Sequence, residues 1–250
     1  MSERWLQTPN LPKKKITLAA ISEKAHSVRR ALVAFDIRCM PVPCCRDLAG
    51  PVASHADMLL HHLENEHFLM AQENRRLLKR MEREKGVVRL LSRKLAPFYP
   101  HDILLNVFRL GQHCFGLATC AAEIRSFCEE NNLMFHLVKQ GYAKCSTVLV
   151  NEQACITADV SIAAAVKQCG LDVLQIRPGF VELPGYPYGF LGGASGKLSS
   201  DVLAFAGNLD THPDAKEIRA FLLNHHVSVL SLQKGPLLDL GGILPLREEA

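Results

Sequence analysis

A repeated order of elements along the chain constrains its fold more than any other sequence feature. From residue 22 onward, a segment with helical spacing of apolar residues is followed by a short apolar strand, and then by two strands across a turn. This order occurs five times, and successive hairpins begin 45, 43, 45 and 49 residues apart. A period of about 45 residues is typical of stacked or radial repeat folds, whose units cover one another's cores.

The hairpin starts define the units. They lie at Asp57, Asp102, Cys145, Phe190 and Asp239, and the last two read Phe-Leu-Gly-Gly and Asp-Leu-Gly-Gly. We therefore expect an α/β fold, a five-fold pseudo-symmetric propeller of helix–strand–hairpin repeats, in which radial closure hides the sheet edges. A single domain would cover residues 1–250. Its approximate repeats would be 14–71, 72–118, 119–158, 159–208 and 209–250.

Local signals refine this expectation. Ser22 and Asp159 are expected to cap helices over 22–35 and 159–169. The last hairpin, which begins at Leu238, is expected to be cut short by the C-terminus, and Lys197 is expected to be exposed.

Composition excludes several classes of protein. With 48% hydrophobic and 22% charged residues the chain is not disordered, and no apolar run is long enough to span a membrane. The nine cysteines are odd in number and irregular in spacing, so with no secretion leader they are expected to be reduced thiols in a cytoplasmic protein. The sequence indicates no cofactor and leaves the oligomeric state open.

Positive charge is concentrated in one segment. Residues 73–94 carry nine Lys or Arg and three Asp or Glu. This segment is either a solvated helix face followed by a strand, or a surface for RNA or another acidic partner. Because no aromatic residues alternate with the charges, nucleic-acid binding is the less favoured alternative.

Five stretches of the sequence resemble a known fold family. They are Ser54-His-Ala-Asp-Met58, Tyr99-Pro-His-Asp102, Gln140-Gly-Tyr-Ala-Lys-Cys-Ser146, Gly189-Phe-Leu-Gly-Gly193 and Leu238-Asp-Leu-Gly-Gly-Ile-Leu-Pro245. They are similar to an uncharacterised bacterial family with the pentein fold of the guanidino-group-modifying enzymes, over about residues 14–246. The pentein group includes arginine deiminase, amidinotransferases, dimethylarginine hydrolase and a translation factor without enzymatic activity. The resemblance implies a site in the central channel, where the hairpin starts converge.

The catalytic pattern of those enzymes matches this chain only in part. In those enzymes a cysteine of the last unit attacks the guanidinium carbon. A histidine of an H-x-D/E motif in the middle unit is the general acid/base, and acidic residues hold the guanidinium. Here no cysteine follows Cys169, and His55-Ala-Asp57 has the H-x-D form but lies in the first unit. The middle unit offers Lys144-Cys145-Ser146 instead.

The residues point to one candidate site. Asp57, Asp102 and Asp239 occupy equivalent hairpin starts, so they either ring a channel mouth that favours a cationic ligand or cap individual turns. Cys145 is either a nucleophile, activated by Lys144 and paired with His55 or His101, or a small buried thiol. The further expected ligand-binding residues are His101, Lys144, Ser146, Gly192 and Gly193, the glycines where backbone packs closely around the channel.

A second cluster contains residues that could bind a metal ion, but its spacing does not favour a metal site. His55, Asp57, His61, His62 and His67 are close in sequence, and residues 55, 57 and 61 would share one face of a strand. Their spacing matches no established zinc pattern, so we expect no metal there.

Overall fold

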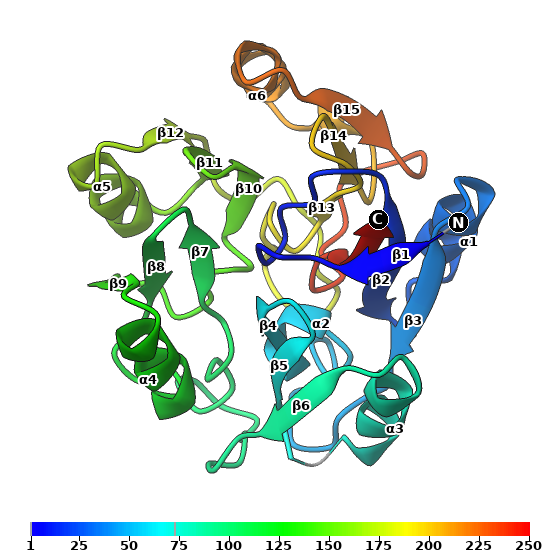
Figure 1. Ribbon diagram of the computed structural model, residues 1–250. Coiled ribbons are helices and arrows are strands. Elements are labelled where there is room, and N and C mark those ends of the chain that lie inside the picture. Colours follow the sequence, from blue (N-terminus) through cyan, green and yellow to red (C-terminus); the bar gives the residue numbers. More distant parts are fainter. Residues whose placement is uncertain (1, 73) are drawn as a thin grey trace.

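Five small β-sheets organise the chain in the computed structural model, which describes residues 2–72 and 74–250 (Figure 1). Four sheets have three strands each, and all four have the same topology. Their strands are β4 (Leu60–Glu64), β5 (His67–Met70) and β6 (Val87–Leu90); β7 (Phe108–Leu110), β8 (His113–Gly116) and β9 (Met134–Leu137); β10 (Thr147–Asn151), β11 (Ala154–Thr157) and β12 (Asp172–Gln175); and β13 (Ser195–Lys197), β14 (Val202–Phe205) and β15 (Ser228–Ser231). In each sheet the first two strands pair antiparallel and the third pairs parallel to the second.

A helix connects each parallel pair of strands. The connecting helices are α3 (Arg75–Arg83), α4 (Ala122–Glu130), α5 (Val160–Gln168) and α6 (Ala215–Asn224) in these four sheets, and α1 (His26–Ala34) in the fifth. A parallel pair needs such a crossover, because the chain must return to the end of the sheet at which the first strand began before the second strand can start. Two shorter helices, α2 (Ala56–Leu59) and the 3₁₀ helix η1 (Leu209–Thr211), lie outside this pattern.

The fifth sheet joins the two ends of the chain. Its strands are ordered β1 (Glu3–Trp5), β16 (Leu244–Glu249), β2 (Ile16–Ser22) and β3 (Arg38–Val42). The described residues end with β16, so the last hairpin is cut short as expected, and β2 pairs antiparallel with β16 in place of the missing strand. This replacement strand comes from the beginning of the chain, a long-range pairing that the local pattern does not encode.

The sheets are offset from the expected repeats. Each three-stranded sheet takes two strands from one expected repeat and the third from the next; β4 and β5, for example, lie in 14–71, whereas β6 lies in 72–118. The structural unit is therefore strand–strand–helix–strand, and the hairpin comes at its beginning.

Burial changes regularly across each sheet. The antiparallel strands are largely buried, and β11 is buried along its whole length, whereas the third strands β6, β9, β12 and β15 are mostly exposed or half-buried. Figure 1 shows the first strands toward the middle of the molecule and the connecting helices α1 and α3 to α6 on the outside. The centre of the molecule is therefore built from first strands and from the loops that precede them.

Capping explains some helix starts and corrects one expectation. The side chain of Asp159 accepts backbone hydrogen bonds from Ser161 and Ile162 and caps α5 as expected. Ser22 caps no helix: it ends β2, its hydroxyl is buried against that of Ser54 at 2.6 Å, and α1 begins only at His26. A hydroxyl beside an apolar helical stripe looks like a cap in the sequence, but tertiary burial decides its partner.

Lys197 also differs from expectation. Its side chain is buried, and its ammonium donates to the carbonyl of Ser200 at 2.7 Å. Burial lowers the pKa of Lys197 to about 8.

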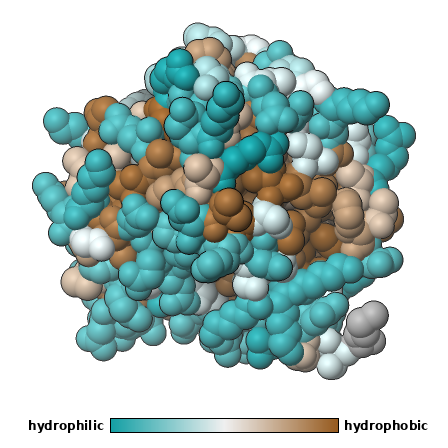
Figure 2. All heavy atoms as spheres, turned by 90° about the horizontal axis from the view of Figure 1, so that it is seen from above, coloured by the Kyte–Doolittle hydropathy of each residue, from teal (hydrophilic) through white to brown (hydrophobic). Residues whose placement is uncertain are grey.

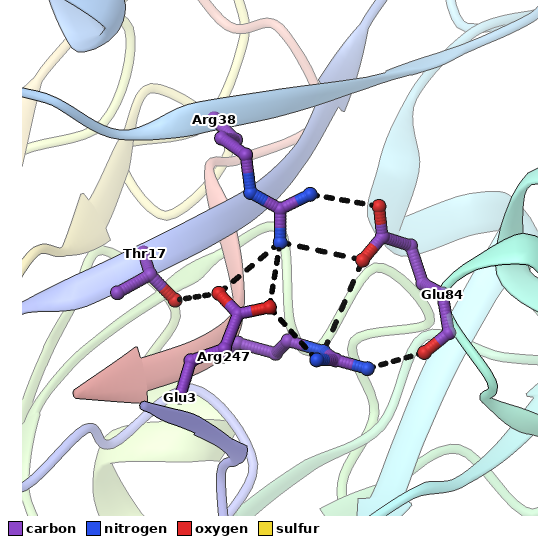
Figure 3. Close-up of polar contacts among 5 residues, drawn as sticks. All are labelled: Glu3, Thr17, Arg38, Glu84 and Arg247. Atoms are coloured by element: carbon purple, nitrogen blue, oxygen red, sulfur yellow. Dashed lines mark hydrogen bonds and ion pairs between the residues drawn. The ribbon is translucent and has the colours of Figure 1, made fainter. Parts of the chain in front are cut away.

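A network of charged side chains links the chain ends to the unit that follows (Figure 3). Arg38 contacts both Glu3 and Glu84 at 2.8 Å, and Arg247 contacts Glu3 at 2.8 Å. Thr17 donates to Glu3 at 2.8 Å. The network joins β1, β16, β2 and β3 to the C-terminal end of α3.

The outer surface is mainly polar. Figure 2 shows hydrophilic residues over most of the side seen from above, with hydrophobic residues gathered in smaller areas. No helix in the described part of the chain is long and apolar enough to cross a membrane. None of the nine cysteines, all of which lie among the described residues, forms a disulfide.

Candidate active site

The thiol of Cys145 lies among polar side chains at the buried centre of the fold. It donates to Asp57 Oδ2 at 3.0 Å, and the amide of Asn106 donates to the sulfur at 3.0 Å. Asn106 Oδ1 accepts the backbone N–H groups of Lys144 and Cys145, at 2.7 and 3.1 Å. Asn106 therefore fixes both the backbone and the thiol, and three segments far apart in sequence meet at one sulfur atom.

Asp239 and His55 adjoin this group. His55 Nδ1 lies 3.7 Å from Asp239 Oδ1, and both side chains are almost fully buried. Asp239 also accepts the backbone N–H groups of Phe190 and Gly241, at 2.9 and 3.0 Å. These contacts hold the Asp239 carboxylate in a single orientation toward the imidazole.

Burial and negative charge set the state of Cys145. The pKa of its thiol is raised well above the usual value, first by burial and then by the charges of Asp57 and Asp239. The expectation that Lys144 lowers this pKa is wrong: the preceding lysine is itself buried, and the two carboxylates face the sulfur. In this state Cys145 is a protonated thiol. Burial likewise raises the pKa of Asp239, against the lowering effect of His55.

The third expected acid, Asp102, has a different partner. Its Oδ2 accepts a hydrogen bond from the Tyr142 hydroxyl at 2.6 Å, and its Oδ1 is buried without a hydrogen-bond partner. Burial and this carboxylate raise the pKa of Tyr142 far above its usual range. His101 lies half-buried against the Phe98 ring and 3.4 Å from Arg93, so its contacts are with surface residues rather than with Cys145.

The remaining expected residues line the same region. A Cβ at Gly192 would lie 2.5 Å from the carbonyl of Cys145, and one at Gly193 would lie 2.0 Å from Asp239 Oδ1. Glycine at both positions lets the backbone approach the centre. The hydroxyl of Ser146 is buried without a hydrogen-bond partner, beside a pocket that also contains Gly189 and Phe190.

The expected strand register at residues 55–61 is wrong. Residues 56–59 form the helical turn α2, so His55, Asp57 and His61 do not share a strand face. His61 Nδ1 lies 3.1 Å from the carbonyl of Leu105, and His62 Nε2 lies 2.7 Å from that of Asn65. Burial lowers the pKa of both imidazoles to about 4.

Sequence reasoning missed three residues of the site. Asn106 interrupts the apolar run from Ile103 to Phe108, and a polar residue there is the one local signal that could have marked it. Tyr142 lies within the stretch 140–146, but nothing in the sequence links it to Asp102. Gly241 has φ +74°, and a Cβ there would lie 2.3 Å from the Cβ of His55, so glycine is required where the backbone passes the imidazole.

Two pockets adjoin the centre. One of about 210 Å³ lies beside Ser146 and Phe190 and is also lined by Asp159, Arg177 and Tyr188. The other, beside Asp57 and Lys144, measures only about 10 Å³ and is partly lined by Asn10. Figure 1 shows the segment between β1 and β2, which carries Asn10, crossing the middle of the molecule.

The basic segment 73–94 begins at Glu73, outside the described residues. Within α3, Arg76 lies 3.7 Å from Glu23, and Arg80 donates to the carbonyl of Pro41. These two basic side chains thus contact the neighbouring sheet.

Several solved structures share this fold, and their descriptions name the enzymes. Inosamine-phosphate amidinotransferase from Streptomyces griseus has 11% sequence identity and a TM-score of 0.62, over 99% of this chain and 98% of that one. DDAH from Pseudomonas aeruginosa, as a cysteine-to-serine mutant complexed with citrulline, has 11% identity and a TM-score of 0.55, over 88% and 93%. Agmatine deiminase from C. jejuni has 8% identity and a TM-score of 0.55, over 93% and 90%.

These similarities establish a mixed α/β fold of the pentein type, as the sequence motifs predict. No curated protein matches the sequence. A protein-family profile matches residues 20–244. The chain belongs to that family, which is described as a family of unknown function, DUF6873.

Proposed function

We propose that the protein binds a small guanidine- or amine-bearing cation between Asp57 and Asp239, and that Cys145 and His55 act on it. One observation carries this proposal: two buried carboxylates flank a buried thiol, and Asp57 Oδ1 has no hydrogen-bond partner. An unsatisfied buried carboxylate oxygen costs at least about 1–3 kcal/mol. A guanidinium offers several N–H donors in one plane, which suits paired carboxylates.

The binding of a cation would also activate the thiol. The charges of Asp57 and Asp239 raise the pKa of Cys145, and a cation between them would offset both charges. The thiolate would then form a bond to the guanidinium carbon, while an amine departs with the proton that His55 transfers from the thiol. Water would cleave the carbon–sulfur bond, which releases a urea and restores the thiol.

A five-bladed propeller would explain why this nucleophile lies in the middle unit and not in the last. In support, β10 contacts β7 and β13, and β13 contacts β16, so that first strands of successive sheets are neighbours. In such an arrangement the residues before any first strand face the same centre. A cysteine from one unit could then replace a cysteine from another.

Access requires movement of the lining. The cavity beside Asp57 holds about 10 Å³, far less than a guanidinium needs. The segment that carries Asn10 covers this side of the centre, so its displacement is the simplest way to admit a ligand.

Thermal shift and thiol labelling together test the proposal. Arginine, agmatine, creatine and methylated guanidines would be compared with citrulline, whose urea group is uncharged. At a concentration 100 times its Kd, the true ligand should raise Tm by roughly 5–10 °C. Because the ligand would lie against the sulfur, it should also protect Cys145 from iodoacetamide, with the labelled cysteines located by mass spectrometry.

Matched variants assign the effect to the centre. Asp57→Asn and Asp239→Asn should abolish the shift, whereas Asp210→Asn, at an exposed ion pair with Arg219, should retain it. If no cationic small molecule stabilises the protein, the proposal is wrong. Salt-sensitive binding of RNA or ribosomes would then favour the alternative of a macromolecular partner.

A further inference from the structure

Three side chains with metal-binding atoms meet at a cluster that is separate from the candidate active site at Cys145. They are His113 on β8, His136 on β9 and Cys169 at the C-terminal end of α5, and all three are half-buried. Their ligand atoms lie within 4.8 Å of one another. The proposed function uses none of them.

The topology explains why they converge. In the parallel pairing of β8 with β9, His113 is opposite Met134 and Phe115 is opposite His136. His113 and His136 are therefore diagonal neighbours on one face of the sheet, because side chains alternate along a strand. Cys169 follows the last turn of α5, the helix that connects two strands of the next sheet. Its thiol contacts the imidazole of His136.

One nitrogen lies at the centre of the group. His136 Nε2 is 2.8 Å from His113 Nδ1 and 3.5 Å from Cys169 Sγ. The imidazole of His136 also stacks on Phe115, with ring centroids 5.0 Å apart, which limits its rotation. Cys169 Sγ is also 3.7 Å from Nδ1 of the same ring, so the sulfur lies beside the imidazole and not on the lone-pair axis of Nε2. The two nitrogens and the sulfur thus lie close together, and a turn of the Cys169 side chain would direct all three at one ion.

These separations are close to those of a tetrahedral zinc site. With Zn–N near 2.05 Å and Zn–S near 2.3 Å, ligand atoms lie about 3.6 Å apart for an N–S pair and about 3.35 Å apart for an N–N pair. The distance of 3.5 Å between Cys169 Sγ and His136 Nε2 is of this size, but the distance of 3.7 Å to Nδ1 means that the thiol would need to turn toward the Nε2 lone pair. The two imidazole nitrogens, now at hydrogen-bond distance, would need to separate by only about 0.5 Å.

The donor set selects the metal. Imidazole and thiolate suit Zn²⁺ and similar borderline cations, whereas Ca²⁺ and Mg²⁺ require oxygen ligands. We propose that His113, His136 and Cys169 bind a zinc ion that cross-links the sheet β7–β8–β9 to helix α5 of the next unit. Binding replaces the thiol proton, which is released to solvent, and water completes the tetrahedron.

Metal titration of the purified full chain tests this site. Zn²⁺ should bind at one equivalent and raise Tm by roughly 5–10 °C at 100 times its Kd. Co²⁺ in its place should give visible d–d bands and a near-ultraviolet thiolate-to-metal band. Zn²⁺ should also protect Cys169 from iodoacetamide.

The variants separate this site from the other thiols and imidazoles. Cys169→Ser and His113→Gln should each remove the thermal shift, and Cys169→Ser should also remove the thiolate band. Cys39→Ser, at another half-buried thiol, and His26→Gln, at an exposed imidazole, should leave every signal unchanged. Circular dichroism confirms that each variant is folded; if Cys169→Ser does not fold, His113→Gln decides the question. A thiolate band or a bound equivalent that persists in Cys169→Ser or His113→Gln, or the absence of both in the wild type, overturns the proposal.

Discussion

The thiol of Cys145 donates a hydrogen bond to Asp57 Oδ2 at 3.0 Å, although 88 residues separate the two in sequence. Both groups are buried, and the carboxylate stabilises the protonated thiol while opposing the thiolate. The pair therefore keeps the candidate nucleophile unreactive until something offsets the negative charge. This relationship makes the protonation of Cys145 the most informative property to measure.

Asp57→Asn should lower the pKa of Cys145. A nearby carboxylate shifts a neighbouring group by about 1–3 pH units, so the pH profile of alkylation by iodoacetamide should move to lower pH by at least about one unit. The rate at pH 8 should rise accordingly. Asp102→Asn is the control, because Tyr142 binds that carboxylate, and the profile of Cys145 should stay in place. Identical profiles for Asp57→Asn and wild type would contradict the electrostatic account.

Gly241→Ala should destabilise the fold by at least about 3 kcal/mol, because left-handed strain of about 1 kcal/mol adds to a clash with the backbone and Cβ of His55. Two other glycines separate the contributions. Gly235→Ala has φ +91° and open space, so it should cost only the strain, and Gly50→Ala should be near neutral. Urea denaturation measures all three. Equal losses in Gly241→Ala and Gly235→Ala would show that His55 does not pack against this backbone.

Arg247→Ala should cost more stability than Arg38→Ala, although both belong to the network of Figure 3. The Arg247 side chain is 14% exposed and lies over the Trp5 ring at 4.2 Å, whereas that of Arg38 is 50% exposed. We expect a loss of about 2–3 kcal/mol for Arg247→Ala and at most about 1 kcal/mol for Arg38→Ala. Trp5 is the one tryptophan of the chain, so its fluorescence reports directly on the packing of β1. An unchanged emission spectrum in Arg247→Ala would count against this contact.

Acidification should destabilise the protein through His62. Burial lowers its folded pKa to about 4 from an unfolded value near 6.5, so the unfolded state binds the proton first. The stabilisation from neutral His62 is complete above pH 6.5. It is lost as pH falls toward 4, by up to about 1.4 kcal/mol per pH unit. His62→Gln retains a donor for the carbonyl of Asn65 and should reduce this slope by the share of His62, while His61, whose pKa is also lowered to about 4, keeps its own share. Urea denaturation between pH 4 and 7 measures how the free energy of unfolding of each protein depends on pH. An equal dependence in wild type and His62→Gln would exclude His62 as the cause.

Local sequence determined the elements whose signals are local. Helix α5 begins where Asp159 can cap it, because capping acts within a few residues. The repeating order of these elements was also readable, together with motifs that indicate the pentein fold. The candidate residues Asp57, Cys145 and Asp239 were proposed in this way, because they recur at the starts of successive hairpins, and His55 was proposed from its H-x-D form; the structure places these four residues near one another.

Tertiary structure alone decided how these residues meet. The pairing of β16 with β2 joins segments more than two hundred residues apart, and no local pattern encodes it. Asn106 lies within an apolar run of the sequence, and only the assembled sheets make it a hydrogen-bond donor to Cys145. The adjacent Lys144 suggested an activated thiol, yet burial and two distant carboxylates reverse that effect. Protonation depends on the charges and the solvent around a group in space, which sequence neighbours do not specify.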